Sequence, residues 1–144
     1  MSVFADSSAI VKLYSDEEGS RSIRNLGVMA VSEIARVEVP AALWRKHRMS
    51  QLSLESVTVL VRTFEGDYAG HAVSGTILLP IAVTSAVIER AAGLLASSGL
   101  RAYDALQLAS ALAARDADPE CSTFAAFDSE LRTAAAYQGF TSLP

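Results

Sequence analysis

The chain has 144 residues, of which 51% are hydrophobic and 19% charged, so it has enough apolar material for a packed core and is not intrinsically disordered. Twelve Lys and Arg residues face sixteen Asp and Glu residues, and the net charge of -4 is the opposite of what a nonspecific duplex-DNA binder carries. The single cysteine, Cys121, excludes an internal disulfide and a cysteine-based zinc site. We expect a single domain over residues 1–144 in a reducing cytoplasm.

The first elements predicted along the chain are a strand, a helix and a second strand. Residues 3–5 are a short apolar run that ends at Asp6, and a helix is expected over 7–14. The polar residues 15–21 form a loop or the start of a second helix, and residues 28–31 form the next buried strand.

Two longer helices are expected next. Ser32 is the expected N-cap of a helix that runs to about Arg48. Ser53 caps the following helix, which carries apolar residues at helical spacing, namely Val57, Leu60, Val61, Phe64 and Tyr68.

The second half of the chain continues to alternate strands and helices. A strand is expected at 77–80, then a helix that Thr84 caps and that ends before Gly99. The remaining expected elements are a buried, Ala- and Leu-rich helix at 103–115, a strand at 123–127, a helix at 128–137 and a short strand at 140–143.

This alternation predicts the α/β class, as a three-layer α/β/α arrangement with a central, mostly parallel sheet. Ligands in such folds bind beyond the carboxyl ends of the strands. No segment has a membrane or targeting pattern: residues 1–14 reach Asp6 before Lys12, which reverses the charge order of a signal peptide, and the uncharged stretch 72–88 is broken by glycine and proline.

Four acidic residues are candidates for a ligand site in that architecture. Asp6 and Asp128 each follow an expected strand, and each is also a plausible helix N-cap. Asp104 opens the most apolar helix, where it would also favour the helix dipole. Carboxylates that converge on one sheet edge would repel one another unless a cation held them, and oxygen ligands select magnesium or manganese.

Glu38 is the fourth of these acids. If residues 33–48 form one helix, its inward stripe is Ile34, Val37, Ala41 and Trp44. Glu38 falls within this stripe. A carboxylate on an apolar face needs a partner, because uncompensated burial costs several kcal/mol. The partner is either a cation or Arg45, which lies two turns further along the same helix.

The surroundings of these acids resemble the motifs of PIN domains, and among them the small VapC-like ribonuclease toxins of type II toxin–antitoxin systems. Residues 3–14 resemble the first motif, a strand, an Asp and a Ser two residues later, here Asp6 and Ser8. The other three motifs are matched by residues 32–38, 100–109 and 127–131, which supply Glu38, Asp104 and Asp128. One position departs from the pattern, because family members often have Thr or Ser where this chain has Ala126.

The resemblance implies a divalent-metal-dependent endoribonuclease that hydrolyses RNA phosphodiester bonds. Its site would hold one or two magnesium or manganese ions on Asp6, Glu38, Asp104 and Asp128, with Ser8 in a supporting role. The protein would form a homodimer and would be silenced by a small cognate antitoxin.

Basic and aromatic residues near the acids are candidates for RNA contacts, although each by itself fits an ordinary surface or core position. The candidates for backbone contacts are Lys12, Arg36, Arg45 and Arg101, and those for base stacking are Trp44 and Tyr103.

Two alternatives stay open beside the toxin hypothesis: a catalytically silent PIN-like binding or regulatory module, and a solitary PIN nuclease without an antitoxin. A haloacid-dehalogenase-like phosphatase is disfavoured, because Ser8 stands where its Asp-x-Asp motif has the second Asp.

Overall fold

Five parallel strands form one sheet at the centre of the structure, a computed structural model that describes residues 2–144. The strand order is β3-β2-β1-β4-β5. Their bounds are β1 (Ser2–Ala5), β2 (Val28–Ser32), β3 (Ile77–Ile81), β4 (Cys121–Ala125) and β5 (Thr141–Leu143). Every neighbouring pair is parallel, so all carboxyl ends lie on one edge.

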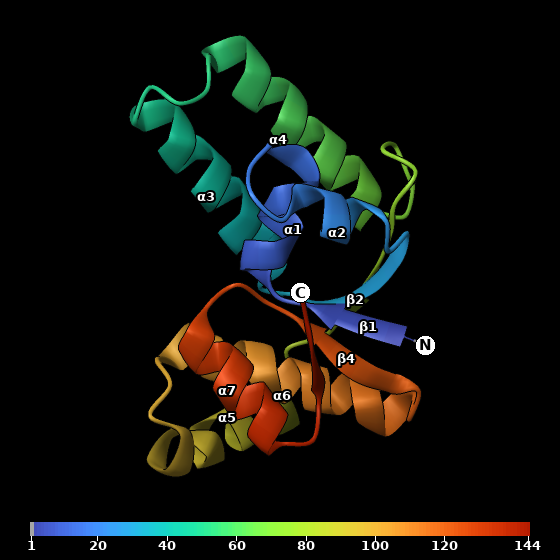
Figure 1. Cartoon of the computed structure of the whole chain (residues 1–144), viewed down its shortest axis with the longest axis vertical. Coiled ribbons are helices and arrows are strands. Elements are labelled where there is room, and N and C mark those ends of the chain that lie inside the picture. The colour runs from blue at the N-terminus through green and yellow to red at the C-terminus, as the bar shows by residue number, and fades with distance from the viewer. Residues whose placement is uncertain (1) are drawn as a thin grey trace.

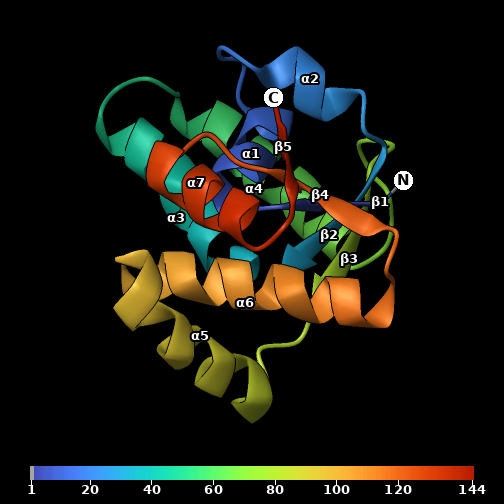
Figure 2. The same cartoon turned by 60° about the horizontal axis from the view of Figure 1, so that its bottom comes forward.

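Helices cover both faces of the sheet, as Figures 1 and 2 show. One face carries α1 (Ser7–Tyr14), α2 (Ser20–Arg24), α3 (Ala35–Arg48) and α4 (Leu54–Tyr68). The other carries α5 (Ser85–Ser98), α6 (Ala102–Ala117) and α7 (Ser129–Tyr137). The expected three-layer α/β/α fold is therefore confirmed. Within residues 2–144, every helix is too short or too polar to cross a bilayer.

The alternation of side chains along the central strand gives each face its own core. Val3 and Ala5 of β1 point into the cluster under α1–α4, whereas Phe4 points into the cluster under α5–α7. There Phe4 stacks on Phe124 with ring centroids 5.4 Å apart. Because β1 is buried on both faces, residues that follow it are held firmly at the carboxyl edge.

Side-chain caps start several helices where the sequence predicts them. The Ser53 side chain accepts a hydrogen bond from the Ser56 N–H, and Thr84 does the same for Val87. Gly99 ends α5 with φ 66, a left-handed conformation that glycine adopts without strain. The stretch 15–21 contains a helical start, since α2 begins at Ser20. The predicted stripe of α4 packs against the core under α1–α4.

The expected start of α3 is wrong by two residues. Ser32 is not an N-cap, because it is the last residue of β2 and pairs with Ile81 of β3. The helix begins at Ala35, after Ile34, which provides no side-chain cap. Because β2 pairs with β3, which is distant in sequence, the strand continues past its apolar residues 28–31 to Ser32.

The expected inward stripe of α3 is also wrong. Its buried residues are Ala35, Val39 and Leu43, whereas Val37 is 72% exposed. The buried face is therefore rotated from the prediction, because α3 packs between α1 and α4.

Strand β4 ends earlier than expected, at Ala125, so Asp128 does not follow the strand directly. Ala126 and Phe127 intervene, and Ala126 is fully buried in the core under α5–α7. The position where the PIN pattern often has a hydroxyl therefore serves packing in this chain.

Candidate functional site

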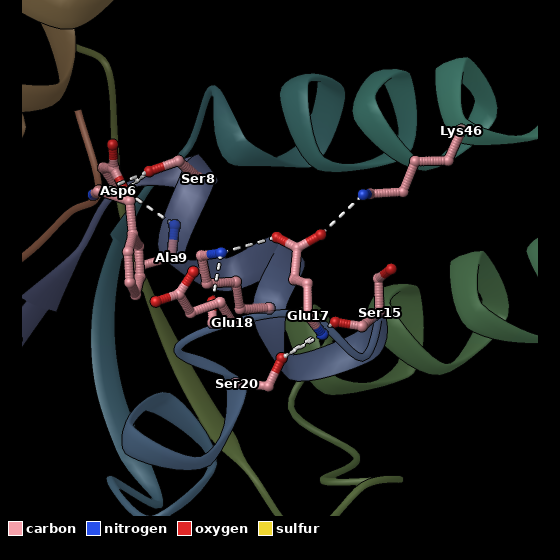
Figure 3. A network of polar contacts seen from close by, with 10 residues as sticks. Asp6, Ser8, Ala9, Ser15, Glu17, Glu18, Ser20 and Lys46 are labelled. Carbon is pink, nitrogen blue, oxygen red and sulfur yellow. Dashed lines mark hydrogen bonds and ion pairs between the residues drawn. The ribbon is translucent and has the colours of Figure 1, made fainter. Parts of the chain in front are cut away.

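Asp6 lies where the central strand β1 passes into α1 (Figure 3). Its Oδ1 accepts a hydrogen bond from the backbone N–H of Ala9 at 2.9 Å and another from the Ser8 hydroxyl at 2.7 Å. The first contact is that of an N-cap. The second places Ser8 beside Asp6, where the resemblance expects a supporting residue.

Burial and negative neighbours make Asp6 unusual. The residue is 4% exposed, and this burial raises the pKa of Asp6 from its ordinary value of 3.8 to about 7. The hydrogen bonds from Ser8 and Ala9 oppose the rise, and the charges of Asp104 and Glu38 add to it. Among the described residues, the charges that act on Asp6 are both negative.

Asp104 stands in the first turn of α6, and the charges of nearby acids also change its pKa. Partial burial raises the pKa of Asp104, and the negative charge of Asp128 raises it further. Arg101 lowers this pKa, while Glu38 and Glu130 raise it. Residues far apart in sequence therefore lie within electrostatic range of one another.

Glu38 projects from the start of α3 into a small polar cluster. Its Oε1 accepts hydrogen bonds from the Ser7 hydroxyl and from Nε2 of Gln107, both at 2.8 Å. The same Nε2 donates to Oγ of Ser7 at 2.8 Å. Within residues 2–144, no ion pair joins Glu38 to Arg45, so that partner does not account for it.

Gln107 is the most informative residue that the sequence reasoning missed. It is 2% exposed, and its buried Oε1 has no hydrogen-bond partner among residues 2–144, although Nε2 donates two hydrogen bonds. Leaving an amide oxygen unsatisfied costs stability. The available signal was a lone amide three residues after Asp104, in the Ala- and Leu-rich middle of the helix.

Asp128 is the N-cap of α7. Its Oδ1 accepts a hydrogen bond from the Leu131 N–H at 2.8 Å, so the capping interpretation holds for Asp128 as it does for Asp6. Capping does not exclude a second role, because each carboxylate uses only Oδ1 for its cap.

The chemistry of these acids fits a divalent cation. Across residues 2–144, no hydrogen-bond donor reaches Oδ2 of Asp6, Oε2 of Glu38, Oδ2 of Asp128 or either side-chain oxygen of Asp104. A buried carboxylate among other carboxylates is costly until a cation compensates it. Free hard oxygens are the ligands that magnesium and manganese prefer.

The geometry for holding an ion is not preformed. Among the described residues, no group of three or more His, Cys, Asp or Glu side chains is placed so that it could hold a metal ion. The acids are near enough to perturb one another's pKa values, but they do not enclose a common point. Ion binding would therefore require side-chain rotation.

The candidate RNA-contact residues differ in their exposure and in whether they form ion pairs. Arg101 and Arg45 are exposed and make no ion pair with the described residues, whereas Arg36 pairs with Glu65 at 3.2 Å. Tyr103 is 64% exposed, and Trp44 is partly buried against the core.

Lys12 is held inside a network. Its Nζ contacts Glu17 Oε1 at 2.9 Å and lies 4.3 Å from the ring centre of Phe127. Glu17 also pairs with Lys46 at 2.7 Å, which ties the loop after α1 to α3 (Figure 3). Lys12 is therefore less available for RNA than either free arginine.

A second buried acid was also missed. Asp67 of α4 is fully buried and accepts hydrogen bonds from the Tyr14 hydroxyl at 2.7 Å and from the Ser74 N–H at 2.9 Å. This network joins α1 and α4 to the loop before β3. The Asp67 network contains none of the four candidate acids, because the partners of Asp67 are Tyr14 and Ser74.

Comparison with known proteins adds information on the fold. No protein-family model matches this sequence, and no curated protein matches it. Among solved structures, the chain is similar to the crystal structure of PAE2754 from Pyrobaculum aerophilum, with a TM-score of 0.59 and 15% sequence identity. The match covers 99% of this chain and 89% of that chain. At this identity, the similarity shows a shared fold.

Proposed function

We propose that this chain is a divalent-metal-dependent endoribonuclease and the toxin of a toxin–antitoxin pair. The observation that carries the proposal is the environment of Asp6, a buried carboxylate with one free oxygen whose charged neighbours are Asp104 and Glu38. A divalent cation is the partner that makes such a group favourable.

Four carboxylates would hold the ion in this proposal, and neighbouring polar groups would orient them. Ser8 holds Oδ1 of Asp6, and Ser7 and Gln107 hold Oε1 of Glu38. Oδ2 of Asp6 and Oε2 of Glu38 have no donor among residues 2–144 and are the oxygens that would turn toward the ion. When bound, magnesium or manganese activates water and stabilises the charge that develops on a phosphoryl group.

An acidic protein needs local positive charge to hold RNA. Arg101 acts on Asp104 electrostatically and is exposed, so it stands beside the acids with its guanidinium free for a phosphate. Because few cations are free near the site, we expect weak RNA binding that depends on the divalent ion.

The test is cleavage of single-stranded RNA by purified protein with manganese or magnesium. We expect activity that EDTA abolishes and that Asp6→Asn and Asp104→Asn each reduce by about 100-fold or more. The matched control is Asp116→Asn, which removes one acid at the other end of α6, where Asp116 pairs with Arg90 on the surface.

The outcomes separate the hypotheses. Equal residual activity in the wild type and in Asp104→Asn would mark that activity as contamination. RNA binding without cleavage would identify a catalytically silent module.

The toxin assignment rests on the four motifs and has its own test. Expression of the wild type should arrest growth, and Asp104→Asn should not. A cognate antitoxin should be encoded next to this chain and should restore growth. Cleavage in vitro without growth arrest would indicate a solitary nuclease. Sedimentation of the purified protein tests the proposed homodimer.

A further inference from the structure

A cavity of about 500 Å³ lies beside the acids, between the end of α5, α6 and one face of α7. Its apolar part includes Leu108 and Ala134, which are both buried. Its polar part comes mainly from α7 and begins at Ser129, the residue after Asp128. A cavity of this size can hold a small organic group.

Among the described residues, most polar side chains on the α7 side of the cavity lack a partner, and Thr133, whose hydroxyl donates to the Ser129 carbonyl, is the exception. Within residues 2–144, the side chains of Ser129, Glu130, Tyr137 and Gln138 make no hydrogen bond or ion pair. Tyr137 is 88% exposed, so its ring is open for stacking. Free polar groups around an apolar floor are typical of a ligand pocket.

The cavity lies near the candidate metal centre, because Ser129, which lines the cavity, directly follows Asp128. The charge of Glu130, which lines the cavity, acts on Asp104. Gly99 lines the opposite side and lies two residues before Arg101. A nucleotide chain with one phosphate near the acids and Arg101 could therefore place a neighbouring base in this cavity.

We propose that this cavity binds a base adjoining the bond that is cut, with guanine preferred, and the proposal rests on the nuclease function above. The Glu130 carboxylate disfavours a phosphate and favours a group with N–H donors. The Watson–Crick edge of guanine presents N1–H and an amino group side by side, which matches the two oxygens of a carboxylate.

The other bases match Glu130 less well. Adenine and cytosine each present one amino group beside a ring nitrogen that repels a carboxylate. Uracil presents one N–H between two carbonyl oxygens, which repel it on both sides. Tyr137 would stack on any base, so it contributes affinity without selectivity.

The experiment measures nucleotide binding without cleavage. Labelled protein in EDTA is titrated with the four 5′-nucleoside monophosphates, and amide chemical shifts are followed at residues 97–99 and 129–138. We expect saturable shifts there, with GMP bound about tenfold more tightly than UMP. Glu130→Gln should remove most of that difference, and Tyr137→Ala should weaken all four nucleotides about fivefold.

Glu89→Gln is the matched control, because it removes an exposed carboxylate of α5 that lies outside the cavity. It should leave binding unchanged. If pocket resonances do not shift, or if Glu130→Gln leaves selectivity intact, the inference is overturned even when the protein cleaves RNA. If this protein binds nucleotides selectively but has no nuclease activity, the proposed nuclease function is wrong and the proposed base-binding cavity is supported.

Discussion

Burial and the charges of the acids around it raise the pKa of Asp6 against the opposing hydrogen bonds from Ser8 and Ala9. The resulting pKa is about 7, whereas an exposed Asp has lost its proton well below neutral pH. Between these two pKa values, the folded protein holds a proton that the unfolded chain has released. Stability therefore falls as pH rises through this range, because ionisation is disfavoured in the folded state.

Asp6→Asn should remove this dependence, because the amide keeps an oxygen for Ser8 and Ala9 and never ionises. The shift corresponds to about 4 kcal/mol when fully developed. We expect the variant to be more stable than the wild type at pH 8 without metal and to differ little from it at pH 4. Urea unfolding between pH 4 and pH 8 measures this difference in stability, with Asp116→Asn as the control. Parallel stability curves would contradict the assigned environment of Asp6.

Gln107 contributes at the same scale by orienting Glu38. Gln107→Leu keeps the side-chain volume and leaves the Ser7–Glu38 hydrogen bond in place. It removes the two hydrogen bonds that Nε2 donates, and removal of the unsatisfied buried oxygen offsets that loss. We expect little change in stability, an RNA KM near that of the wild type, and a kcat lower by about tenfold.

Ser110→Ala is the control for Gln107→Leu, because Ser110 is buried one turn further along α6 and bonds to Ser32 instead of an acid. It should cost about 1 kcal/mol of stability and leave kcat unchanged. A lower kcat in Ser110→Ala would indicate that disturbance of α6 itself explains the effect of Gln107→Leu.

At the scale of elements, local rules account for most boundaries. Ser53, Thr84 and Gly99 act as the caps that their residue types indicate. Ser32 has a good capping side chain and yet ends a strand, because backbone pairing with β3 prevails over the local preference. The rotated face of α3 has a similar cause, since its neighbours α1 and α4 decide which residues are buried.

The two roles of Asp128 can be separated with two substitutions. Asp128→Asn keeps an oxygen for the Leu131 N–H and removes the charge, whereas Asp128→Ala removes both. We expect both variants to lose nuclease activity, and only the alanine variant to lose about 1 kcal/mol of stability. Thermal unfolding and RNA cleavage on the same preparations measure the two effects. Full activity in Asp128→Asn would show that Asp128 only caps α7.

At the scale of the whole molecule, the alternation of strands and helices predicted the parallel sheet, and the sheet brings distant acids toward one edge. The expectation that Asp6, Glu38 and Asp104 approach one another came from this coarse fold, and the PIN-like motifs around the acids agreed with it. The hydrogen bonds from Gln107 and Ser7 could not be predicted, since they depend on how α6 lies against α1 and α3. The cavity beside α7 likewise arises only from packing.

Protons and the metal ion should compete for the Asp6 carboxylate, so metal binding by the molecule should depend on pH. Because the pKa of Asp6 is about 7, the apparent affinity for manganese should rise about tenfold between pH 6 and pH 8. Calorimetric titration at several pH values measures this rise, and Asp6→Asn should remove it together with most of the affinity. Affinity that is independent of pH would place the ion away from Asp6.

The most direct measurement is the anomalous diffraction of a crystal soaked in manganese. We expect a peak in contact with Asp6 and Asp104, with the side chains of Glu38 and Asp128 turned toward it, and no such peak in crystals of Asp104→Asn. Manganese bound only at other carboxylates, with these four acids left apart, would contradict the proposed metal centre and leave Asp6 and Asp128 as helix caps.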